Sequence, residues 1–239
     1  MSARMSTGSN RSTAVVIPVK GKHPKGRLSP LLTPTQRRQL QVAMLEDTLQ
    51  TLIRARMVRD TFIVSSDSQI LEFAGRFGAN AILEHGDLGV NSAVSLGLER
   101  TSRFASRMVI PADLPLLTAA DMRKVTWLAD EGADVVISPS QSFDGTNLLL
   151  LREGAFELHY DDDSFRKHMR MALARGMVTS MYCSRGVGFD IDTPKDVEEF
   201  LGSGARGSTL TFLGRTLRGK ESLRPRIGSP QGRALRRDV

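Results

Sequence analysis

Short apolar segments alternate with helical patterns along most of this 239-residue chain. The segments are rich in Val, Ile and Leu, a composition typical of strands that are buried on both faces. They occupy residues 14–19, 61–65, 79–83, 108–110, 134–138, 143–151 and 178–183. Helical patterns between the strands favour parallel pairing, because two parallel strands need a long crossover connection. The alternation therefore predicts an α/β fold with a mostly parallel sheet that is covered by helices on both faces.

The net charge of +7 is concentrated at the C-terminal end of the chain. Residues 203–239 contain nine Lys and Arg but only two acidic residues, whereas residues 1–202 carry equal numbers of both signs. This distribution predicts a disordered N-terminal lead (residues 1–12), one folded domain (residues 13–202) and a basic, flexible C-terminal extension.

A basic extension also raises the alternative of a protein that binds nucleic acid or a membrane surface. The neutral body, the aromatic content of 5% and the lack of an RNA-binding motif argue against nucleic acid. No apolar run approaches the roughly 20 residues that span a bilayer, and residues 1–13 lack the apolar core of a signal peptide. Because Cys183 is the single cysteine, a cytoplasmic protein without a membrane partner is expected. Deletion of residues 203–239 separates the alternatives, because a binding module would lose its partner whereas an enzyme is expected to keep its turnover.

An aspartate follows the fourth apolar segment, where residues 108–117 read MVIPADLPLL. Pro111 ends the strand and, together with Pro115, frames Asp113 at the exit of the strand. Ligands of open α/β sheets bind at the carboxyl ends of the strands, and a carboxylate there suits a hard cation such as Mg²⁺. The alternative interpretation is that Asp113 forms a turn or caps the next helix.

Two further aspartates, Asp190 and Asp192, flank Ile191 in the segment GFDIDTP. Residues two apart in an extended segment point the same way, so both carboxylates can face one cation. If this segment lies beside Asp113, three carboxylates converge, and a divalent metal is needed to neutralise them. The alternative is that Asp192 caps the helix that begins at residue 193.

A basic loop with two glycines, KGKHPKGRL, occupies residues 20–28. Lys20, Lys25 and Arg27 are suited to phosphate, and the glycines let the backbone approach a ligand closely. Such a segment taken alone is more often a solvated loop. Together with the aspartates it indicates metal-assisted nucleotidyl transfer, in which cations clamp a triphosphate and no protein nucleophile is needed.

Two polar residues stand at the expected starts of helices. Asn91 follows a glycine-containing loop, and it either caps the next helix or offers its amide to a base edge. Capping is the safer interpretation. Ser164 follows three aspartates at residues 161–163 and is a candidate cap, because acidic residues favour a helix start.

The chain resembles the guanylyltransferases of coenzyme F-420 biosynthesis from about residue 15 to residue 201. The segments that carry the resemblance are IPVKGKHPKGRLSPLLTPTQRRQLQVAMLEDTL, GVNSA, PADLPLLT, DGTNLLLLR, DSFRKH and GFDIDTPKD. These enzymes act on 2-phospho-L-lactate, phosphoenolpyruvate or 3-phospho-D-glycerate. The resemblance implies a Rossmann-like three-layer sandwich of the nucleotide-diphospho-sugar transferase kind. It also implies Mg²⁺-dependent transfer of GMP from GTP to a phosphorylated acid, with release of pyrophosphate.

The resemblance assigns groups of residues by their positions. The metal-binding aspartates, expected to hold two Mg²⁺ ions, are Asp113, Asp190 and Asp192. The nucleotide-binding residues are Lys20, Lys25, Arg27, Gly89 and Asn91. The residues expected at the acceptor are Thr146, Asp161 and Ser164. The implied catalytic residues are Asp113 and Lys25.

The turn before Ser164 departs from the family pattern. The family usually has a Gly-Pro-Gly turn there, whereas this chain has three aspartates. A carboxylate at Asp161 repels an anionic acceptor unless it contacts metal or accepts a hydroxyl proton. Because 3-phospho-D-glycerate has such a hydroxyl and phosphoenolpyruvate has none, the hypothesis is that the turn favours 3-phospho-D-glycerate. The alternative is that the acids only start a helix.

A second enzymatic interpretation is another nucleotidyltransferase of the same fold, acting on a sugar phosphate or on the molybdenum cofactor. The loop at residues 20–28 and the GTN segment favour the F-420 family. The sequence leaves the oligomeric state open, a homodimer included. It also leaves open whether Phe212 and the leucines near it dock on the body or on the downstream enzyme that accepts the product.

Overall fold

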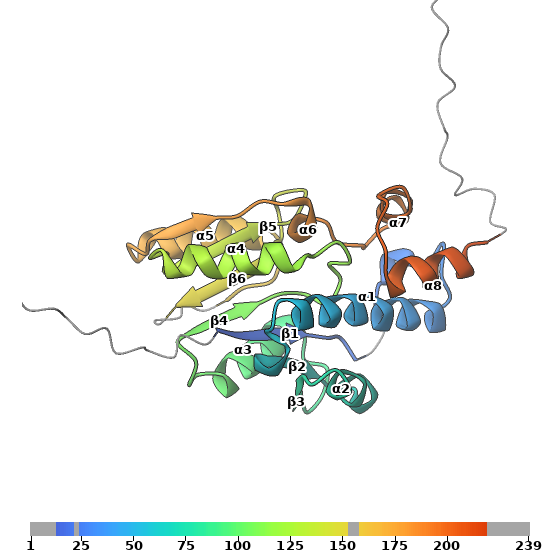
Figure 1. Cartoon of the computed structure of the whole chain (residues 1–239), viewed down its shortest axis with the longest axis horizontal. Coiled ribbons are helices and arrows are strands. Elements are labelled where there is room, and N and C mark those ends of the chain that lie inside the picture. Colours follow the sequence, from blue (N-terminus) through green and yellow to red (C-terminus); the bar gives the residue numbers. More distant parts are fainter. Residues whose placement is uncertain (1–12, 22–23, 153–157, 219–239) are drawn as a thin grey trace, which may run out of the picture.

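The computed structural model describes residues 13–21, 24–152 and 158–218, so the expected lead at residues 1–12 lies outside the described residues. Seven strands form one sheet in the order β3-β2-β1-β4-β6-β5-β7 (Figure 1). They are β1 (Thr13–Pro18), β2 (Thr61–Ser65), β3 (Asn80–Leu83), β4 (Ser106–Val109), β5 (Val135–Pro139), β6 (Thr146–Arg152) and β7 (Thr179–Met181). Only β6 runs antiparallel to its neighbours in this described sheet, which confirms the mostly parallel arrangement.

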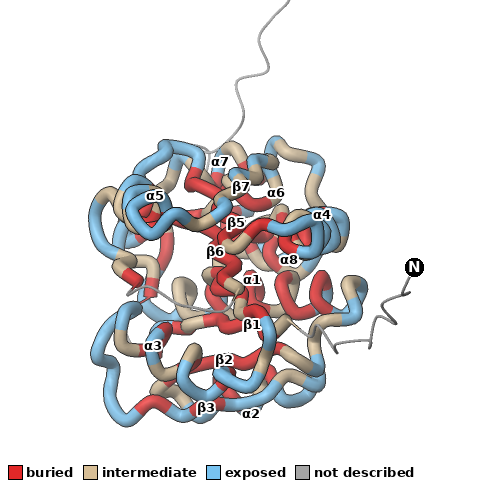
Figure 2. The backbone as a smooth tube through the Cα atoms, turned by 90° about the vertical axis from the view of Figure 1, so that its left-hand side faces the viewer, coloured by how far each residue is buried: buried red, intermediate tan, exposed pale blue. Residues whose placement is uncertain are grey.

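Helices cover both faces of the sheet. One layer is made by α1 (Pro34–Arg54), α2 (Ser68–Gly75) and α4 (Ala119–Asp130), and the opposite layer by α3 (Val90–Arg100) and α5 (Ser164–Ala174). Val15 and Val16 of β1 point to opposite faces, because side chains alternate along a strand, and each joins a different apolar cluster. Figure 2 shows the buried residues concentrated in the sheet between the helix layers. The expected three-layer α/β sandwich is confirmed.

Threonine capping boxes start three of the helices. Thr33 before α1, Thr118 before α4 and Thr193 before α7 (Pro194–Leu201) each accept a hydrogen bond from the third helical N–H, and that residue's side chain reaches back. The boxes before α4 and α7 fix where the loops that carry the aspartates end.

The C-terminal part corrects the expected domain boundary. Helix α8 (Ser208–Thr216) lies along α1 in Figure 1, and its Leu213 is fully buried in a cluster with Met44 and Phe200. The carboxylate of Asp47 accepts hydrogen bonds from the backbone N–H groups of the first turn of α8. The prediction of a flexible extension from residue 203 is wrong for residues 203–218, because apolar burial holds this segment on the body. Residues 219–239 lie outside the described part of the chain.

Short elements complete the fold. They are η1 (Gly26–Leu28), η2 (Val58–Asp60) and α6 (Arg185–Gly188). Among the described residues, no helix combines the length and the apolar character that crossing a membrane requires.

Candidate functional site

The topology brings the ends of several strands to one edge of the sheet. Strand β1 pairs with both β2 and β4, so the chain reverses its direction of winding there, at the place where open α/β sheets bind ligands. Because β6 runs antiparallel to β4, its first residue lies at the edge where β4 ends. The loop after β1, Asp113 after β4 and Thr146 at the start of β6 therefore meet at this edge.

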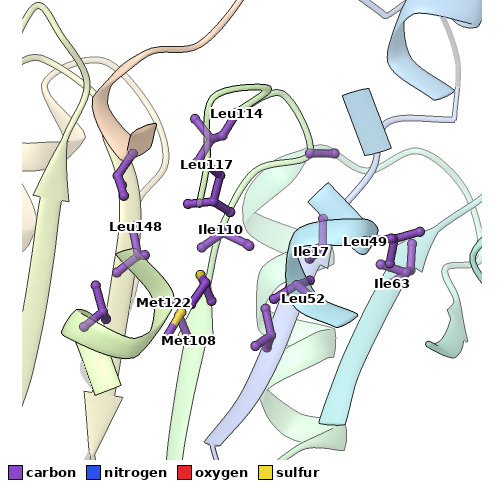
Figure 3. Packing of buried hydrophobic residues seen from close by; sticks show 14 of the residues in the cluster. Ile17, Leu49, Leu52, Ile63, Met108, Ile110, Leu114, Leu117, Met122 and Leu148 are labelled. Atoms are coloured by element: carbon purple, nitrogen blue, oxygen red, sulfur yellow. The ribbon is translucent and has the colours of Figure 1, made fainter. Parts of the chain in front are cut away.

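Asp113 sits in a loop that is anchored on both sides. Leu114 and Leu117 are buried and turn back towards Ile110 and the core (Figure 3). The residue that caps α4 is Thr118, so the alternative that Asp113 caps this helix is wrong. The side chain of Asp113 is held at the mouth of the sheet with a quarter of its surface exposed.

The second aspartate segment lies beside the first. The backbone N–H of Ile191 donates to the carbonyl oxygen of Asp113 at 3.4 Å, and the Ile191 side chain is fully buried. Asp190 and Asp192 therefore flank an anchored residue, as the spacing predicts. Thr193, and not Asp192, caps α7, so the capping alternative for Asp192 is wrong.

Lys25 lies between the carboxylates. Its Nζ is 2.5 Å from Asp113 Oδ2 and 3.7 Å from Asp192 Oδ1, and Arg27 Nη1 is 2.8 Å from Asp192 Oδ2. Burial of Lys25 opposes its charge, but the negative charge of Asp113 outweighs this and raises the pKa of Lys25. Lys25 is thus a charged ammonium among the aspartates, so the alternative of a solvated loop is wrong for Lys25, whereas the side chain of Arg27 is exposed.

The carboxyl group of Asp190 has a raised pKa, so its charged form is disfavoured. Burial and the nearby charge of Asp113 raise the pKa of Asp190 to about 6, although Lys25 opposes the shift. The amide of Asn147 holds Asp190, with Nδ2 at 3.4 Å from Oδ1, and also donates to two backbone carbonyls after β7. Sequence reasoning did not select Asn147 as a site residue; its position beside Thr146 at the mouth of β6 was the available signal.

The capacity of this cluster for a cation can be judged from its oxygens. Asp113 Oδ1 is buried and accepts no hydrogen bond, so it has an unused lone pair. Among the described residues, no group of three or more His, Cys, Asp or Glu stands in metal-binding geometry. The expected set of three aspartates around one ion is therefore not assembled here, because Lys25 already pairs with Asp113 and Asp192.

The residues expected at the acceptor form a second, adjacent group. Thr146 and Ser164 are both buried, and the Thr146 N–H donates to Ser164 Oγ at 3.0 Å. The N-cap of α5 is Asp163, in a left-handed conformation and without a capping side-chain bond, so the capping role expected for Ser164 is wrong. Asp161 is half exposed, and its Oδ1 is 2.8 Å from Lys167 Nζ.

The residues expected at the nucleotide lie around the ends of β1 and β3. Gly89 has a φ of 96° and precedes α3, a conformation that favours glycine. Asn91 Oδ1 accepts the N–H of Tyr160 at 2.7 Å and does not cap α3, which corrects the capping interpretation. The side chain of Lys20 is exposed, while its carbonyl is held by Gln41 Nε2 at 3.0 Å.

One buried residue of this region was missed at the sequence level. His168 of α5 is fully buried, and its Nδ1 is 2.9 Å from Thr146 Oγ1. The available signal was helical spacing, because His168 follows Ser164 by one turn and so lies on the same helix face.

Comparison with known families bears directly on this site. A family model described as "Guanylyl transferase CofC like" matches residues 13–228. The chain belongs to this family. Its match covers the basic loop, both aspartate segments and α8, so α8 is part of the region that the family shares.

Relatives of this CofC-like chain have two different names. A 2-phospho-L-lactate guanylyltransferase from Methanothermobacter thermautotrophicus is 36% identical over 191 residues, which is 79% of this chain and 84% of the relative. A phosphoenolpyruvate guanylyltransferase from Rubrobacter xylanophilus is 37% identical over 198 residues, which is 81% and 95% of the two chains. Two relatives of nearly equal similarity thus differ in the acceptor that they are named for.

Solved structures confirm the fold. A protein described as a nucleotide-diphospho-sugar transferase from Desulfovibrio desulfuricans superposes with a TM-score of 0.66 at 17% identity, covering 88% of this chain and 96% of its own. A cytidylyltransferase from Leptospira borgpetersenii gives a TM-score of 0.55 at 12% identity, with 89% and 96% covered. The expected nucleotide-diphospho-sugar transferase-like fold is therefore confirmed.

Proposed function

We propose that this CofC-like guanylyltransferase transfers GMP from GTP to a phosphorylated three-carbon acid in coenzyme F-420 biosynthesis. The proposal rests on two adjacent groups of side chains. The first is a charge cluster made by Lys25, Asp113, Asp190 and Asp192. The second is the pair of buried hydroxyl groups of Thr146 and Ser164. The first group suits a triphosphate with its cation, and the second suits an anionic acceptor.

The reaction is an in-line displacement. A phosphate oxygen of the acceptor attacks the α-phosphorus of GTP, a new P–O bond forms, and the bond to pyrophosphate breaks. Lys25, Lys20 and Arg27 bind the triphosphate and offset the charge that develops on the leaving group. Thr146 and Ser164 orient the acceptor. No covalent step on the protein is needed, since positioning and charge stabilisation carry such a transfer.

Asp113, Asp190 and Asp192 would hold Mg²⁺ in this proposal. The unused oxygen of Asp113 and the raised pKa of Asp190 fit an incoming divalent cation, because a cation relieves the crowding of the carboxylates. When bound, Mg²⁺ supplies charge neutralisation between the triphosphate and the aspartates. Lys25, which pairs with Asp113 in this structure, would also be in place to bind phosphate oxygens of the triphosphate.

The acceptor we propose is 3-phospho-D-glycerate. Its support is the run of three aspartates at residues 161–163, where Asp161 stands near Ser164 with an ion pair to Lys167. A carboxylate at this turn can accept a hydrogen bond from the hydroxyl of 3-phospho-D-glycerate. Phosphoenolpyruvate lacks that hydroxyl and leaves only the repulsion between anions.

The first experiment measures pyrophosphate release from GTP and Mg²⁺ with 3-phospho-D-glycerate, phosphoenolpyruvate and 2-phospho-L-lactate, supplied separately and in competition. We expect 3-phospho-D-glycerate to be used preferentially. Preference for another of the three acids would overturn the acceptor assignment alone. No release with any of them, from folded protein, would overturn the proposed function.

Replacing residues 161–163 with Gly-Pro-Gly is expected to shift the competition ratio towards phosphoenolpyruvate by about tenfold, the effect of one hydrogen bond to a charged group. Asp163 already has a φ of 60°, so glycine fits this position without strain. Lys167→Gln serves as the matched control, because it removes the ion pair of Asp161 but keeps the carboxylate. An unchanged ratio in the turn variant would mean that acceptor choice lies elsewhere.

A further inference from the structure

The imidazole of His168 is held from two sides in the interior. Its Nε2 is 3.0 Å from the backbone nitrogen of His159, and its Nδ1 is 2.9 Å from Thr146 Oγ1. The ring of Tyr160 packs edge-on against it, with 5.1 Å between the ring centroids. Both ring nitrogens therefore have fixed partners, and the ring cannot turn without breaking two hydrogen bonds.

These partners determine which ring nitrogen carries the proton. A backbone N–H can only donate, so Nε2 of His168 accepts from His159 and carries no hydrogen. A neutral imidazole then has its hydrogen on Nδ1, which donates to Thr146 Oγ1. Burial lowers the pKa of His168 to about 4, which keeps the ring neutral at pH 7.

The tautomer in turn decides what the hydroxyl of Thr146 can do. Its oxygen accepts from His168, so its single hydrogen is left to donate, and the described residues offer it no acceptor. The same holds for Ser164, whose Oγ accepts from the N–H of Thr146. Two buried hydroxyls are thus prepared as donors side by side, a pattern that suits an anionic group such as a carboxylate.

The segment beside the ring links this pair to the nucleotide side. His159 is bound to the ring of His168, and the next residue, Tyr160, donates its N–H to Asn91 Oδ1 at the start of α3. Residues 159–160 are therefore pinned between α5 and α3. This segment therefore joins α5, which carries His168, to the start of α3, where Asn91 is expected at the nucleotide.

We propose that His168 is a positioning residue for the acceptor: its Nδ1–H orients the Thr146 hydroxyl so that this hydroxyl donates to the acid. The inference rests on the proposed function, since it presumes that the acceptor binds at Thr146 and Ser164. His168 itself contacts no substrate and acts through Thr146.

Two variants of similar size separate this role from simple packing. Asn places its amide nitrogen near the position of Nδ1 and can still donate to Thr146, whereas Gln places its amide near Nε2 and loses that contact. We expect His168→Gln to raise KM for the acceptor about tenfold, with KM for GTP within about twofold of wild type. His168→Asn keeps the donor to Thr146 but gives up the bond to the His159 N–H, so we expect its KM for the acceptor to stay within about threefold of wild type.

A double variant provides the cross-check if His168→Gln folds poorly. Thr146→Val removes the hydroxyl, and we expect the same rise in acceptor KM from it alone. Adding His168→Gln to Thr146→Val should change KM by less than about twofold further, because the two residues act as one unit. If the double variant instead shows the product of the two single increases in acceptor KM, and all variants melt as wild type does, the inference is overturned.

A spectroscopic measurement tests the tautomer without any turnover. Long-range proton–nitrogen correlation spectra of the wild-type protein at neutral pH should show His168 protonated on Nδ1 and unprotonated on Nε2. The opposite tautomer would overturn the inference even in an active enzyme. Absent guanylyl transfer by wild type, with the expected tautomer present, would instead overturn the proposed function on which the acceptor role rests.

Discussion

Replacement of Asp113 by Asn is expected to lower kcat/KM for guanylyl transfer about a thousandfold, or roughly 4 kcal/mol, without unfolding the protein. Asn keeps the shape of the side chain but removes the charge that pairs with Lys25 at 2.5 Å. It also replaces one carboxylate oxygen with an amide nitrogen, which cannot bind a cation. The loop itself should hold, because Leu114 and Leu117 anchor it in the core.

The electrostatics of the cluster predict an accompanying change at its neighbours. Burial is the largest cause of the raised pKa of Asp190 and the charge of Asp113 is the next, so neutralising Asp113 should lower this pKa only part of the way towards its ordinary range. Asp113 is also the main group that raises the pKa of Lys25, so after its neutralisation only Asp192 and Asp190 oppose the effect of burial on Lys25. The loss of activity therefore reflects a reorganised cluster as well as one missing carboxylate.

The measurement is steady-state kinetics together with thermal unfolding. Glu72→Gln is the matched control, because it also removes a paired carboxylate, that of Glu72 with Arg76 on the surface of α2, where a pair contributes little. We expect the control to keep wild-type turnover and stability. A folded Asp113→Asn variant that retains activity within tenfold of wild type would contradict the assignment of Asp113 to the transfer step.

Two local rules were enough to predict the two parts of the aspartate cluster from the sequence. Carboxyl ends of parallel strands share an edge, and residues two apart in an extended segment share a face. The first rule placed Asp113 at the ligand-binding edge, and the second put Asp190 and Asp192 on one face, but that the two segments meet was only a condition of the prediction. The position of the Lys25 side chain between the aspartates could not be predicted in this way. It depends on the left-handed backbone conformation of residue 25 and on the path of the loop.

Contacts between segments that are far apart in the chain could not be predicted either, because they also depend on the paths of loops. The capping interpretation of Asn91 relied on helix-start statistics, yet its amide oxygen serves the backbone of Tyr160, 69 positions away. His168 was hidden among polar neighbours in the helix segment DSFRKH. Only the antiparallel insertion of β6 brings Thr146 against α5 and reveals that His168 has a partner there.

The C-terminal boundary was missed because charge was averaged over a long segment. Within residues 203–218, Leu210, Leu213 and Leu217 recur at helical spacing, and this stripe is the face that packs on α1. The basic residues around it hid the stripe in the composition. Composition alone therefore placed the end of the folded body too early.

Ending the chain at residue 202 is accordingly expected to destabilise the protein severely. The deletion exposes the apolar surface that Leu213 and Leu217 cover and leaves Asp47 without the N–H groups that it caps. Burial of two leucine side chains contributes about 3–6 kcal/mol, so the melting temperature should fall by about 10 °C or more. A chain that ends at residue 218 keeps all these contacts and should melt within about 2 °C of the full-length protein.

Activity should follow stability in this series, contrary to the expectation that turnover survives loss of residues 203–239. Ile191, which carries the aspartates on either side of it, shares one apolar cluster with Phe200 and Leu213. Loss of α8 therefore loosens the segment that places Asp190 and Asp192. Leu213→Ala in the full-length chain tests this link at a single side chain, with the exposed Arg215→Ala on the same helix as its control. Full turnover and wild-type melting of the chain ending at residue 202 would mean that α8 supports neither the body nor the site.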